Sequence, residues 1–380
     1  MPGQRALVSV VMPAFNAERY LEAAIQSVLN QSYRTLELLV VDDGSCDGTV
    51  EIVRRYARRD ARVRLLRQGN AGVAAARNRG LAHARGEYIA PLDADDLWYP
   101  NKLALQVACL EQAPDEVGVV YAWSAHINEH GALTGGYSAA QEEGDVYAAL
   151  VLGNFIGNAS ATLFRQACVE RCGGYDASLR ARDAEGCEDA DLYLRFARHF
   201  RFACVPRLLI GYRLLPDSMS CNWARMARSH RYVIDNLRTS HPRLPAAVRR
   251  WSNASFYRYL AWQCGRTDDY WGVLCCLARA GIADWRLWQE RRFRQMARHA
   301  VRRLRDRAPA PTKRVASKLT VEELEQRLYG HAAGGKRSAG GEDRLALARA
   351  WLGGPAEPQS GPALKLRNAQ RSALDEGVTG

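Results

Sequence analysis

The sequence predicts an α/β fold, in which a mostly parallel sheet is flanked by helices and followed by a helical C-terminal region. Three observations predict this fold. The first third of the 380 residues alternates short apolar runs with amphipathic stretches, which is the pattern of parallel strands joined by helical crossovers. Polar residues follow several of the expected strands, at the sheet edge where ligands bind in such folds. Residues 225–307 carry apolar side chains at helical spacing.

The elements follow one another in a regular order. Strands are expected at Leu7–Met12, Leu36–Val41, Val63–Leu66, Tyr88–Leu92, Val117–Ala122 and Ala161–Arg165, and helices at Ala17–Gln31, Ser45–Arg59, Gly72–Ala84, Gln166–Cys172 and within residues 186–198. The first two strands are apolar throughout, as in strands buried on both faces. Ser45, Asp47 and Thr49 are residue types that cap the N-terminus of a helix. Polar groups at Pro13–Asn16, Asp42–Ser45 and Asp93–Asp96 then converge on one edge of the sheet.

The most informative stretch is GEYIAPLDADDLW, residues 86–98, where an apolar strand runs directly into three aspartates. Carboxylates crowded at a strand end repel one another and resist burial, and a divalent cation compensates for both effects. On an extended backbone the side chains of Asp93 and Asp95 leave the same face, so these two residues are the expected metal ligands. The alternative is that the acidic residues cap the next helix, a role that suits Asp96.

Composition restricts the class of protein. Hydrophobic residues make up 47% and charged residues 25% of the chain, as in ordinary globular proteins. No apolar run approaches the ~18 residues of a membrane-spanning helix, and only Arg5 precedes a short apolar run at the start, so no signal peptide is expected. The ten cysteines lack zinc spacing, which indicates reduced core residues. These features predict a cytoplasmic protein.

The net charge of +12 is concentrated in one segment. Residues 225–307 contain 19 Arg and no Lys against 6 acidic residues, whereas the rest of the chain is close to neutral. We therefore expect three regions: a domain at 1–224, a basic helical region at 225–307, and a flexible tail with short helices at 308–380. The expected tail helices are Thr320–Tyr329, with a capping box, and Glu342–Leu352.

The end of the basic region predicts an amphipathic helix over Trp285–Arg307. Its apolar side would carry Trp285, Trp288, Phe293, Met296, Ala300 and Leu304, and its basic side Arg291, Arg294, Arg298, Arg302 and Arg305. Such a helix suits the surface of an anionic membrane, which predicts peripheral contact with the inner face of the membrane. The alternative is a helix docked on the protein with a solvated arginine face.

Four segments resemble a known family. VSVVMPAFN, ELLVVDDGSCDGT, NAGVAAARNRG and GEYIAPLDADD, in this order and spacing, resemble the nucleotide-sugar-binding half of family 2 glycosyltransferases, and the resemblance extends over about residues 6–220. It implies a Rossmann-like nucleotide-diphospho-sugar transferase fold, with a nucleotide-sugar half at about 1–110 and an acceptor half at 111–224. It also implies an inverting hexosyltransferase that uses Mn²⁺ or Mg²⁺.

The resemblance assigns donor-site roles residue by residue. The implied nucleotide-binding residues are Pro13, Phe15, Asn16, Glu18, Asp43, Arg77, Asp93 and Ala94. Asp43 would accept a hydrogen bond from the base, most often uracil in this family, and Arg77 would lie near the base or diphosphate. Asp95 would bind the metal directly, and Asp93 would contact ribose or a metal-bound water. Alternatively, Asp43 forms a turn with Gly44, and Arg77 is a surface residue.

The same resemblance places the chemistry at Glu188 and Asp189. They open the helix expected within residues 186–198, and Asp189 looks like the general base; the alternative is an acidic helix cap. The chain departs from related enzymes after Tyr212 and Arg213, where a histidine often follows but Leu214 and Leu215 stand here.

The predicted function is transfer of a sugar from a nucleotide-diphosphate donor, most often a UDP-sugar, to a hydroxyl of a saccharide or lipid-linked acceptor in polysaccharide or lipid-linked glycan synthesis. A nucleotidyltransferase shares this fold and its need for metal, but the glycine-rich loop of that class is absent after the first strand. A nucleic-acid-binding protein is a third class, indicated only by the arginine-rich region; no nucleic-acid partner is expected.

Overall fold

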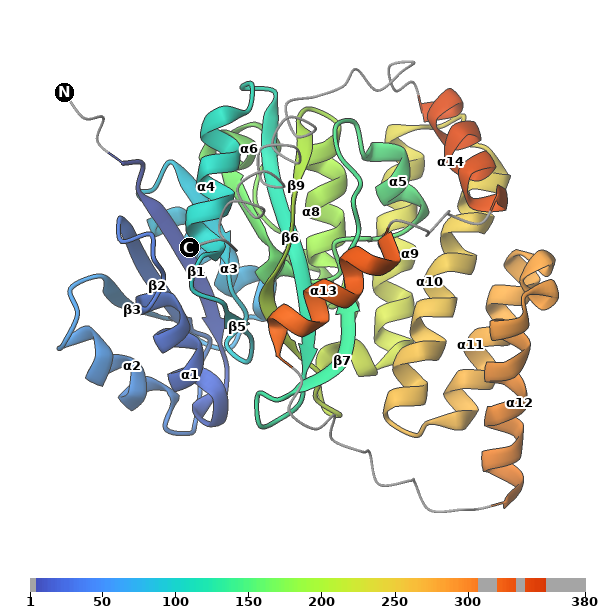
Figure 1. The fold of residues 1–380 in the computed structure, drawn as a ribbon, viewed down its shortest axis with the longest axis horizontal. Helices are drawn as coiled ribbons and strands as arrows, with labels where there is room; N and C mark the ends of the chain where they lie inside the picture. Colours follow the sequence, from blue (N-terminus) through green and yellow to red (C-terminus); the bar gives the residue numbers. More distant parts are fainter. Residues whose placement is uncertain (1–4, 307–319, 333–338, 353–380) are drawn as a thin grey trace.

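The computed structural model describes residues 5–306, 320–332 and 339–352, in which one mixed sheet carries helices on both faces (Figure 1). The strands are β1 (Val8–Ala14), β2 (Leu36–Asp42), β3 (Val63–Arg67), β4 (Tyr88–Pro91), β5 (Leu97–Trp98), β6 (Val117–Ile127), β7 (Leu133–Ser138), β8 (Thr162–Arg165) and β9 (Arg201–Arg213). Within these residues their order is β3-β2-β1-β4-β8-β6-β9-β5, and β7 pairs with β6.

The helices alternate with these strands and then continue alone. They are α1 (Glu18–Leu29), α2 (Thr49–Ala57), α3 (Val73–His83), α4 (Lys102–Gln112), α5 (Tyr147–Leu152), α6 (Gln166–Cys172), α7 (Ser178–Ala181), α8 (Glu188–Ala197), α9 (Trp223–Ser240), α10 (Ala246–Arg266), α11 (Tyr270–Ala283), α12 (Arg291–Asp306), α13 (Val321–Ala332) and α14 (Ala339–Leu352). Short 3₁₀ turns are η1 (Ala159–Ala161), η2 (Met219–Cys221) and η3 (Trp285–Gln289). The predicted α/β class with a helical C-terminal region is confirmed.

The first four predicted strands pair in parallel, as expected from the alternation of strand and helix. β1 pairs with β2 and β4, and β2 pairs with β3. Gly80 lets α3 approach the sheet closely, because a Cβ at this position would lie 2.3 Å from Cγ1 of Val11. The parallel arrangement brings the carboxyl ends of β1, β2 and β4 to one edge, where the predicted site residues lie.

The residues predicted to cap the second helix mainly accept hydrogen bonds from the N-terminus of the first helix, α1. Thr49 Oγ1 accepts a hydrogen bond from the Ala17 N–H (2.8 Å), and Asp47 Oδ2 accepts one from the Glu18 N–H (3.1 Å). α2 begins only at Thr49, not at Ser45. These bonds satisfy the free N–H groups at the start of α1 and join two loops at the site edge.

The second half of the sheet is mixed. β8 runs antiparallel to both β4 and β6, whereas β6 and β9 are parallel. β6 extends to Ile127, five residues beyond its predicted end at Ala122, because its second half pairs with both β7 and β9. This extension carries β6 to the same edge as the first four strands.

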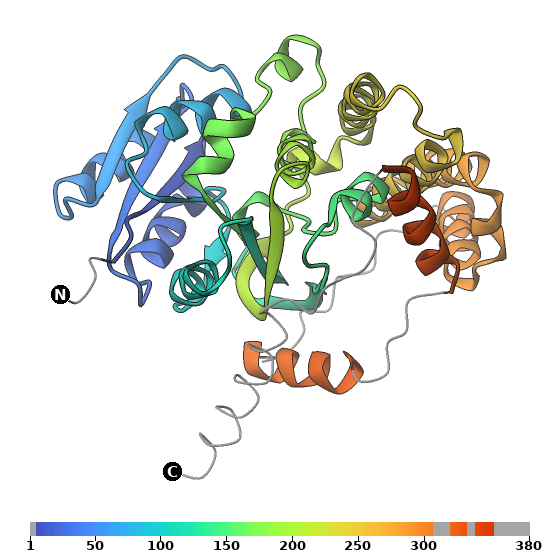
Figure 2. The same ribbon diagram turned by 90° about the horizontal axis from the view of Figure 1, so that it is seen from above.

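The C-terminal helices lie beside the sheet and have a core of their own (Figure 2). Buried side chains of this second core are Met226, Val233, Ala254, Leu260, Ala261, Cys264, Val273, Cys276, Leu277, Ala280, Leu287, Phe293 and Ala300. Cys187, the residue before α8, also belongs to it. The basic helical region therefore packs directly on the start of α8. No helix among the described residues is long and apolar enough to span a membrane.

The prediction of one amphipathic helix over Trp285–Arg307 is wrong. Trp285 and Trp288 lie in η3, and Glu290 adopts an extended conformation (φ −71°, ψ 127°) that separates η3 from α12. Both tryptophans are exposed, whereas Phe293 is buried against the second core. α12 is thus docked through its apolar side, and its five predicted basic-face arginines are exposed to solvent. This arrangement matches the alternative of a docked helix with a solvated arginine face.

The two predicted short helices of the tail are present as α13 and α14, and both pack on the main core. The predicted capping box of α13 is present: the Thr320 N–H donates to Glu323 Oε2 (3.0 Å), and the Glu323 N–H donates to Thr320 Oγ1 (3.2 Å). Glu325 on α13 is buried and accepts hydrogen bonds from the Leu208 N–H (2.7 Å) and from Arg207 Nε. The rest of the predicted tail lies outside the described residues.

A buried carboxylate joins the parallel strands at the edge opposite the site. Glu37 on β2 accepts hydrogen bonds from Ser9 Oγ (2.7 Å), from the Arg85 backbone and guanidinium, and from Arg64 Nη1 (3.0 Å). Burial opposes ionisation, but the bonds from Arg85, Ser9 and Arg64 outweigh it and lower the pKa of Glu37. The carboxylate form therefore stabilises the fold.

We predict that Glu37→Gln lowers the free energy of unfolding by about 2 kcal/mol at pH 7, since charge-assisted hydrogen bonds are lost. A lowered carboxyl pKa stabilises the folded state above the unfolded pKa of about 4.3, and this contribution disappears as the pH falls through the folded value. Urea unfolding at pH 7 and pH 3 should show a difference between variant and wild type that shrinks at the lower pH. A deficit of equal size at both pH values, or one matched by the exposed control Glu111→Gln, would contradict this role.

Candidate active site

The acidic stretch after β4 forms a turn. The Asp96 N–H donates to the Asp93 carbonyl (3.1 Å), so the backbone is not extended here, and the argument that alternation places Asp93 and Asp95 on one face is wrong. The two carboxylates are nevertheless close. Burial, and then the charge of Asp93, raise the pKa of Asp95 to about 7. A cation beside this pair would relieve both effects.

Asp96 anchors the turn. It is buried, and it accepts hydrogen bonds from Ser160 Oγ (2.6 Å) and from the Arg213 N–H (2.8 Å). The Asp93 N–H in turn donates to Ser160 Oγ (3.1 Å). Asp96 does not cap the next helix, because α4 begins at Lys102 after Asn101 and has no side-chain cap. The three aspartates thus divide into one anchor, Asp96, and two carboxylates, Asp93 and Asp95, that do not hold the turn together.

Arg77 connects this turn to the second acidic group. Its guanidinium is buried, with Nη2 2.6 Å from Asp93 Oδ1 and Nη1 2.9 Å from Glu188 Oε1. It also lies 5.2 Å from the centre of the Tyr175 ring. Nε of Arg77 is buried, and no acceptor within the described residues reaches it. Arg77 is therefore not a surface residue.

Glu188 and Asp189 open α8, as expected. Glu188 Oε2 accepts a hydrogen bond from the Gly186 N–H (3.0 Å), and Asp189 Oδ1 accepts one from the Ala190 N–H (2.8 Å). Cys187 is the residue before the helix, and its N–H donates to Ser229 Oγ of α9 (3.0 Å). Burial and the charge of Glu188 raise the pKa of Asp189 to about 7, against the opposing effect of Arg77. A carboxyl group poised near neutral pH suits a general base.

The loop after β2 organises the loop before α3. Asp43 Oδ1 accepts hydrogen bonds from Gln68 Nε2 (2.7 Å) and the Ala71 N–H (2.8 Å), and Oδ2 accepts one from the Gly72 N–H (2.8 Å). Gly72 has φ +91° and directly precedes α3. Asp43 thus does more than form a turn with Gly44: it positions the start of the helix that carries Arg77.

The remaining predicted donor residues lie around these loops. Asn16 has φ +48°, and its Oδ1 accepts from the Cys46 N–H (2.9 Å); Glu18 Oε2 accepts from the Gly48 N–H (2.7 Å). Phe15 is half exposed at the end of β1. Pro13 is buried in β1, and Ala94 is buried in the acidic turn. The loops after β1 and β2 are therefore bonded to each other, and only Phe15 of this group presents a large exposed side chain.

Arg213 is a site residue that the sequence did not assign. Its Nε donates to the Asp95 carbonyl (2.6 Å), and its Nη1 donates to the carbonyls of Asn128 (2.7 Å) and Glu129 (3.0 Å). Its guanidinium also lies over the Tyr20 ring, at 4.7 Å. The Tyr212–Arg213 pair at the end of β9 is the feature of the sequence that could have indicated this role. Arg213 fixes the backbone of the turn that carries Asp95.

The carboxylates present fit a divalent cation. Asp93 and Asp95 supply hard oxygen ligands, and Mg²⁺ typically takes one or two carboxylates together with substrate phosphates. Among the described residues, no group of three or more His, Cys, Asp or Glu side chains could hold a metal ion. The remaining ligands would therefore come from the diphosphate and water.

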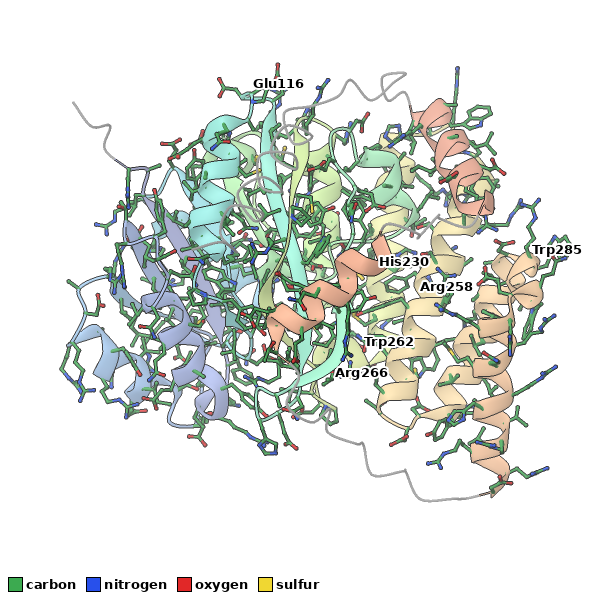
Figure 3. All side chains as sticks on the ribbon, in the orientation of Figure 1. Glu116, His230, Arg258, Trp262, Arg266 and Trp285 are labelled. Carbon is green, nitrogen blue, oxygen red and sulfur yellow. The ribbon has the colours of Figure 1, made fainter. Side chains whose placement is uncertain are left out.

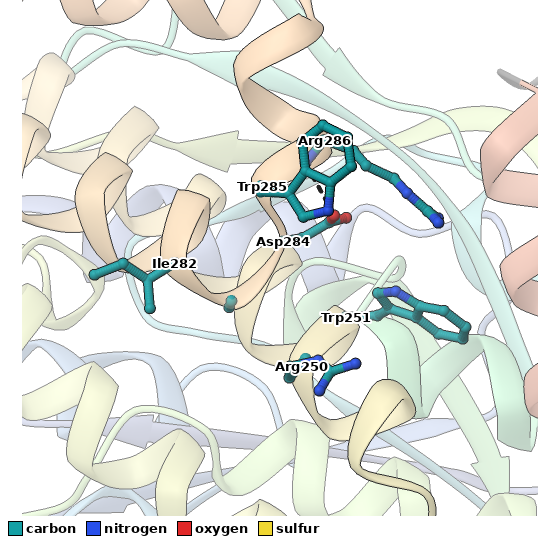
Figure 4. Close-up of a pocket in the computed structure, with 7 residues that line it drawn as sticks. Arg250, Trp251, Ile282, Asp284, Trp285 and Arg286 are labelled. Atoms are coloured by element: carbon teal, nitrogen blue, oxygen red, sulfur yellow. Dashed lines mark hydrogen bonds between the residues drawn. The ribbon is translucent and has the colours of Figure 1, made fainter.

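A separate cavity of about 340 Å³ lies away from these residues, between α10, the end of α11 and η3 (Figure 4). It is lined by Arg250, Trp251, Ile282, Ala283, Asp284, Trp285 and Arg286. None of the predicted site residues lines it.

Comparison with known proteins agrees with this geometry. The glycosyl transferase family 2 model matches residues 9–165. An uncharacterized glycosyltransferase of Haemophilus influenzae is 48% identical over 102 residues, which are 27% of this chain and 41% of that protein. The Escherichia coli UDP-Glc:alpha-D-GlcNAc-diphosphoundecaprenol beta-1,3-glucosyltransferase WfgD is 47% identical over 105 residues, again 27% of this chain and 41% of the relative. The chain thus matches less than half the length of these relatives.

A solved structure extends the likeness of the fold. The mannosyltransferase PcManGT of Pyrobaculum calidifontis, in complex with GDP-Man and Mn²⁺, superposes with a TM-score of 0.51 at 20% identity, over 81% of this chain and 89% of that one. The match of residues 9–165 and the relatives that share this segment show that this part of the chain is similar to glycosyl transferase family 2.

Proposed function

We propose that the protein is an inverting, metal-assisted glycosyltransferase that moves a sugar from a UDP-sugar to a hydroxyl acceptor. The observation that carries this proposal is the bridge made by Arg77, which holds Asp93 and Glu188 on one guanidinium. The bridge joins a carboxylate pair suited to a metal–diphosphate group with Glu188, which directly precedes the proposed base Asp189. Inverting transfer needs both functions at one site.

Names of related proteins support the choice of substrates. WfgD is named for a UDP-Glc donor and a diphosphoundecaprenol-linked acceptor, so a UDP-sugar and a lipid-linked saccharide are the substrates proposed here. PcManGT was solved with Mn²⁺, which supports Mn²⁺ or Mg²⁺ as the cation. The match of residues 9–165 to the glycosyl transferase family 2 model argues against a nucleotidyltransferase.

The proposed reaction is a displacement at the anomeric carbon. Asp189 accepts the proton of the acceptor hydroxyl as its oxygen attacks, and the bond from the anomeric carbon to the diphosphate oxygen breaks on the opposite side. The departing nucleoside diphosphate gains negative charge, which the Arg77 guanidinium would offset from its position between Asp93 and Glu188. A cation held by Asp93 and Asp95 would supply further neutralisation of that charge.

Glu188 is proposed as a positioning residue. Its Oε1 accepts a hydrogen bond from Arg77 and its Oε2 accepts one from the Gly186 N–H. Because both oxygens are engaged in this way, Glu188 is not proposed as the base. Its negative charge raises the pKa of Asp189, which keeps that base close to neutral pH.

The arginine face of α12 supports peripheral contact with an anionic membrane. Arg291, Arg294 and Arg298 are exposed along one helix, and the apolar side of that helix is docked on the protein. The contact proposed here is therefore electrostatic, without insertion of the helix.

We predict that UDP binds in a metal-dependent manner and that Asp95→Asn abolishes this dependence, because the substitution removes a charged oxygen ligand. Calorimetric titration of UDP with Mn²⁺ and with EDTA measures both effects. Asp115→Asn, at an exposed site near the opposite sheet edge, should bind as wild type does. Metal-dependent binding that persists in Asp95→Asn would remove Asp95 from the site.

We predict that kcat/KM rises with pH and levels off above about pH 7, since Asp189 must be deprotonated to act and its pKa is raised to about 7. Asp189→Asn should lower turnover by about 10²–10⁴-fold, the usual contribution of a general base, and leave UDP binding intact. The matched control is Asp191→Asn on the same helix, where the carboxylate pairs with Arg195 instead. Near-normal turnover by Asp189→Asn would reject it as the base.

We predict that wild-type protein floats with vesicles that contain phosphatidylglycerol and not with pure phosphatidylcholine, and that salt weakens the binding. Reversal of Arg291, Arg294 and Arg298 to Glu should reduce binding by at least about tenfold, at ~1 kcal/mol per basic residue. The control reverses three arginines on or next to α2, namely Arg54, Arg58 and Arg59. Equal flotation of both triple variants would argue against α12 as the contact.

A further inference from the structure

One face of α10 presents aromatic side chains beside the candidate active site. Tyr259 and Trp262 have ring centres 6.3 Å apart, and Trp262 lies 6.0 Å from the His126 ring on β6. His126 in turn lies 6.1 Å from Tyr212 on β9. These four rings, here called the aromatic row, connect the C-terminal helices with the site edge of the sheet.

The aromatic row reaches both acidic groups of the site. Tyr212 directly precedes Arg213, whose side chain holds the Asp95 carbonyl. At the other end of the row, Tyr259 packs on the second core, to which Cys187, two residues before Asp189, also belongs. The row therefore lies between the segment that carries Asp95 and the segment that carries the proposed base.

Trp262 is the exposed member of the row and is held in place. Its side chain is 38% exposed, and the Arg266 guanidinium lies 5.3 Å from its ring centre. Gln263 is buried, accepts a hydrogen bond from Arg266 and donates one to the Tyr259 hydroxyl (2.6 Å). Figure 3 shows Trp262 and Arg266 projecting from α10 beside β7. The indole is thus a supported surface and not a loose side chain.

A pyranose ring is the ligand that matches this surface. One face of such a ring is lined by C–H groups, which pack on an indole through dispersion and apolar burial. The hydroxyls at its rim need hydrogen-bond partners, and the Tyr259 hydroxyl and the Arg266 guanidinium lie next to the indole. The Asp189 carboxylate nearby is the group that would take the proton of one such hydroxyl.

We propose that the aromatic row is the acceptor subsite and that a pyranose ring of the acceptor saccharide stacks on Trp262. This inference rests on the proposed function, because the protein has an acceptor saccharide only if it is a glycosyltransferase. Binding of a saccharide to the aromatic row can nevertheless be measured without turnover. It assigns acceptor recognition to α10, outside the segment matched by the family model.

Saturation-transfer NMR on the full-length protein tests the proposal, with methyl β-D-glucopyranoside and methyl N-acetyl-β-D-glucosaminide as probes. Wild type should transfer saturation to the ring C–H protons. Trp262→Ala should weaken probe binding by about threefold to tenfold, as expected for one lost aromatic contact, and Trp262→Phe should retain an intermediate signal. The matched control is Trp271→Ala on α11, an exposed tryptophan outside the row.

The outcomes separate this inference from the proposed function. Wild-type transfer in Trp262→Ala, an equal loss in Trp271→Ala, or no transfer to either probe by wild type would each overturn the subsite. UDP binding, measured in parallel, should be the same in all four proteins. A Trp262-dependent signal in a protein that binds no nucleotide would support the saccharide surface and reject the donor assignment instead.

Discussion

The architecture of the site depends on one buried guanidinium. Arg77 pairs with Asp93 from the turn after β4 and with Glu188 from the start of α8; Arg77 and Glu188 are buried, and Asp93 is partly exposed. Two acidic segments 95 residues apart in the chain would repel each other if they met without it. The buried guanidinium of Arg77, shared between the two segments, offsets this repulsion. Loss of Asp93 or Glu188 would leave part of the charge of Arg77 uncompensated. Asp43 contributes indirectly, because it fixes the start of the helix that carries Arg77.

The carboxylates of the protein fall into two electrostatic classes. Glu37 is buried with several hydrogen-bond donors, and its pKa is lowered, so it serves the fold. Asp95 and Asp189 are partly buried next to other carboxylates, and their pKa values are raised to about 7. Such destabilised carboxylates are common at functional sites, where a ligand or a transferred proton relieves them.

The C-terminal helices are part of the site and not an appendage. Cys187 belongs to the core of these helices, and its N–H donates a hydrogen bond to Ser229 Oγ of α9. The position of Asp189, two residues further on, therefore depends on α9 and α10. The same helices present the aromatic row and, further along, the arginine face of α12. Helical packing thus links the proposed base, the proposed acceptor surface and the proposed membrane contact through one shared core.

The sequence by itself determined the α/β class, the parallel first half of the sheet, the resemblance to a glycosyltransferase family and the acidic groups, because strand and helix periodicities and short motifs are local in the chain. It also determined the capping box of α13, for the same reason. It did not show that Asp96 is an anchor, that Thr49 caps α1, or that Glu290 divides the predicted basic helix. Only the tertiary structure decided these points, and only it showed what Arg77, Arg213 and Trp262 contact. Their roles depend on partners 16 to 136 residues away in the chain, and such long-range pairings are set by packing of the whole domain, which no local pattern encodes.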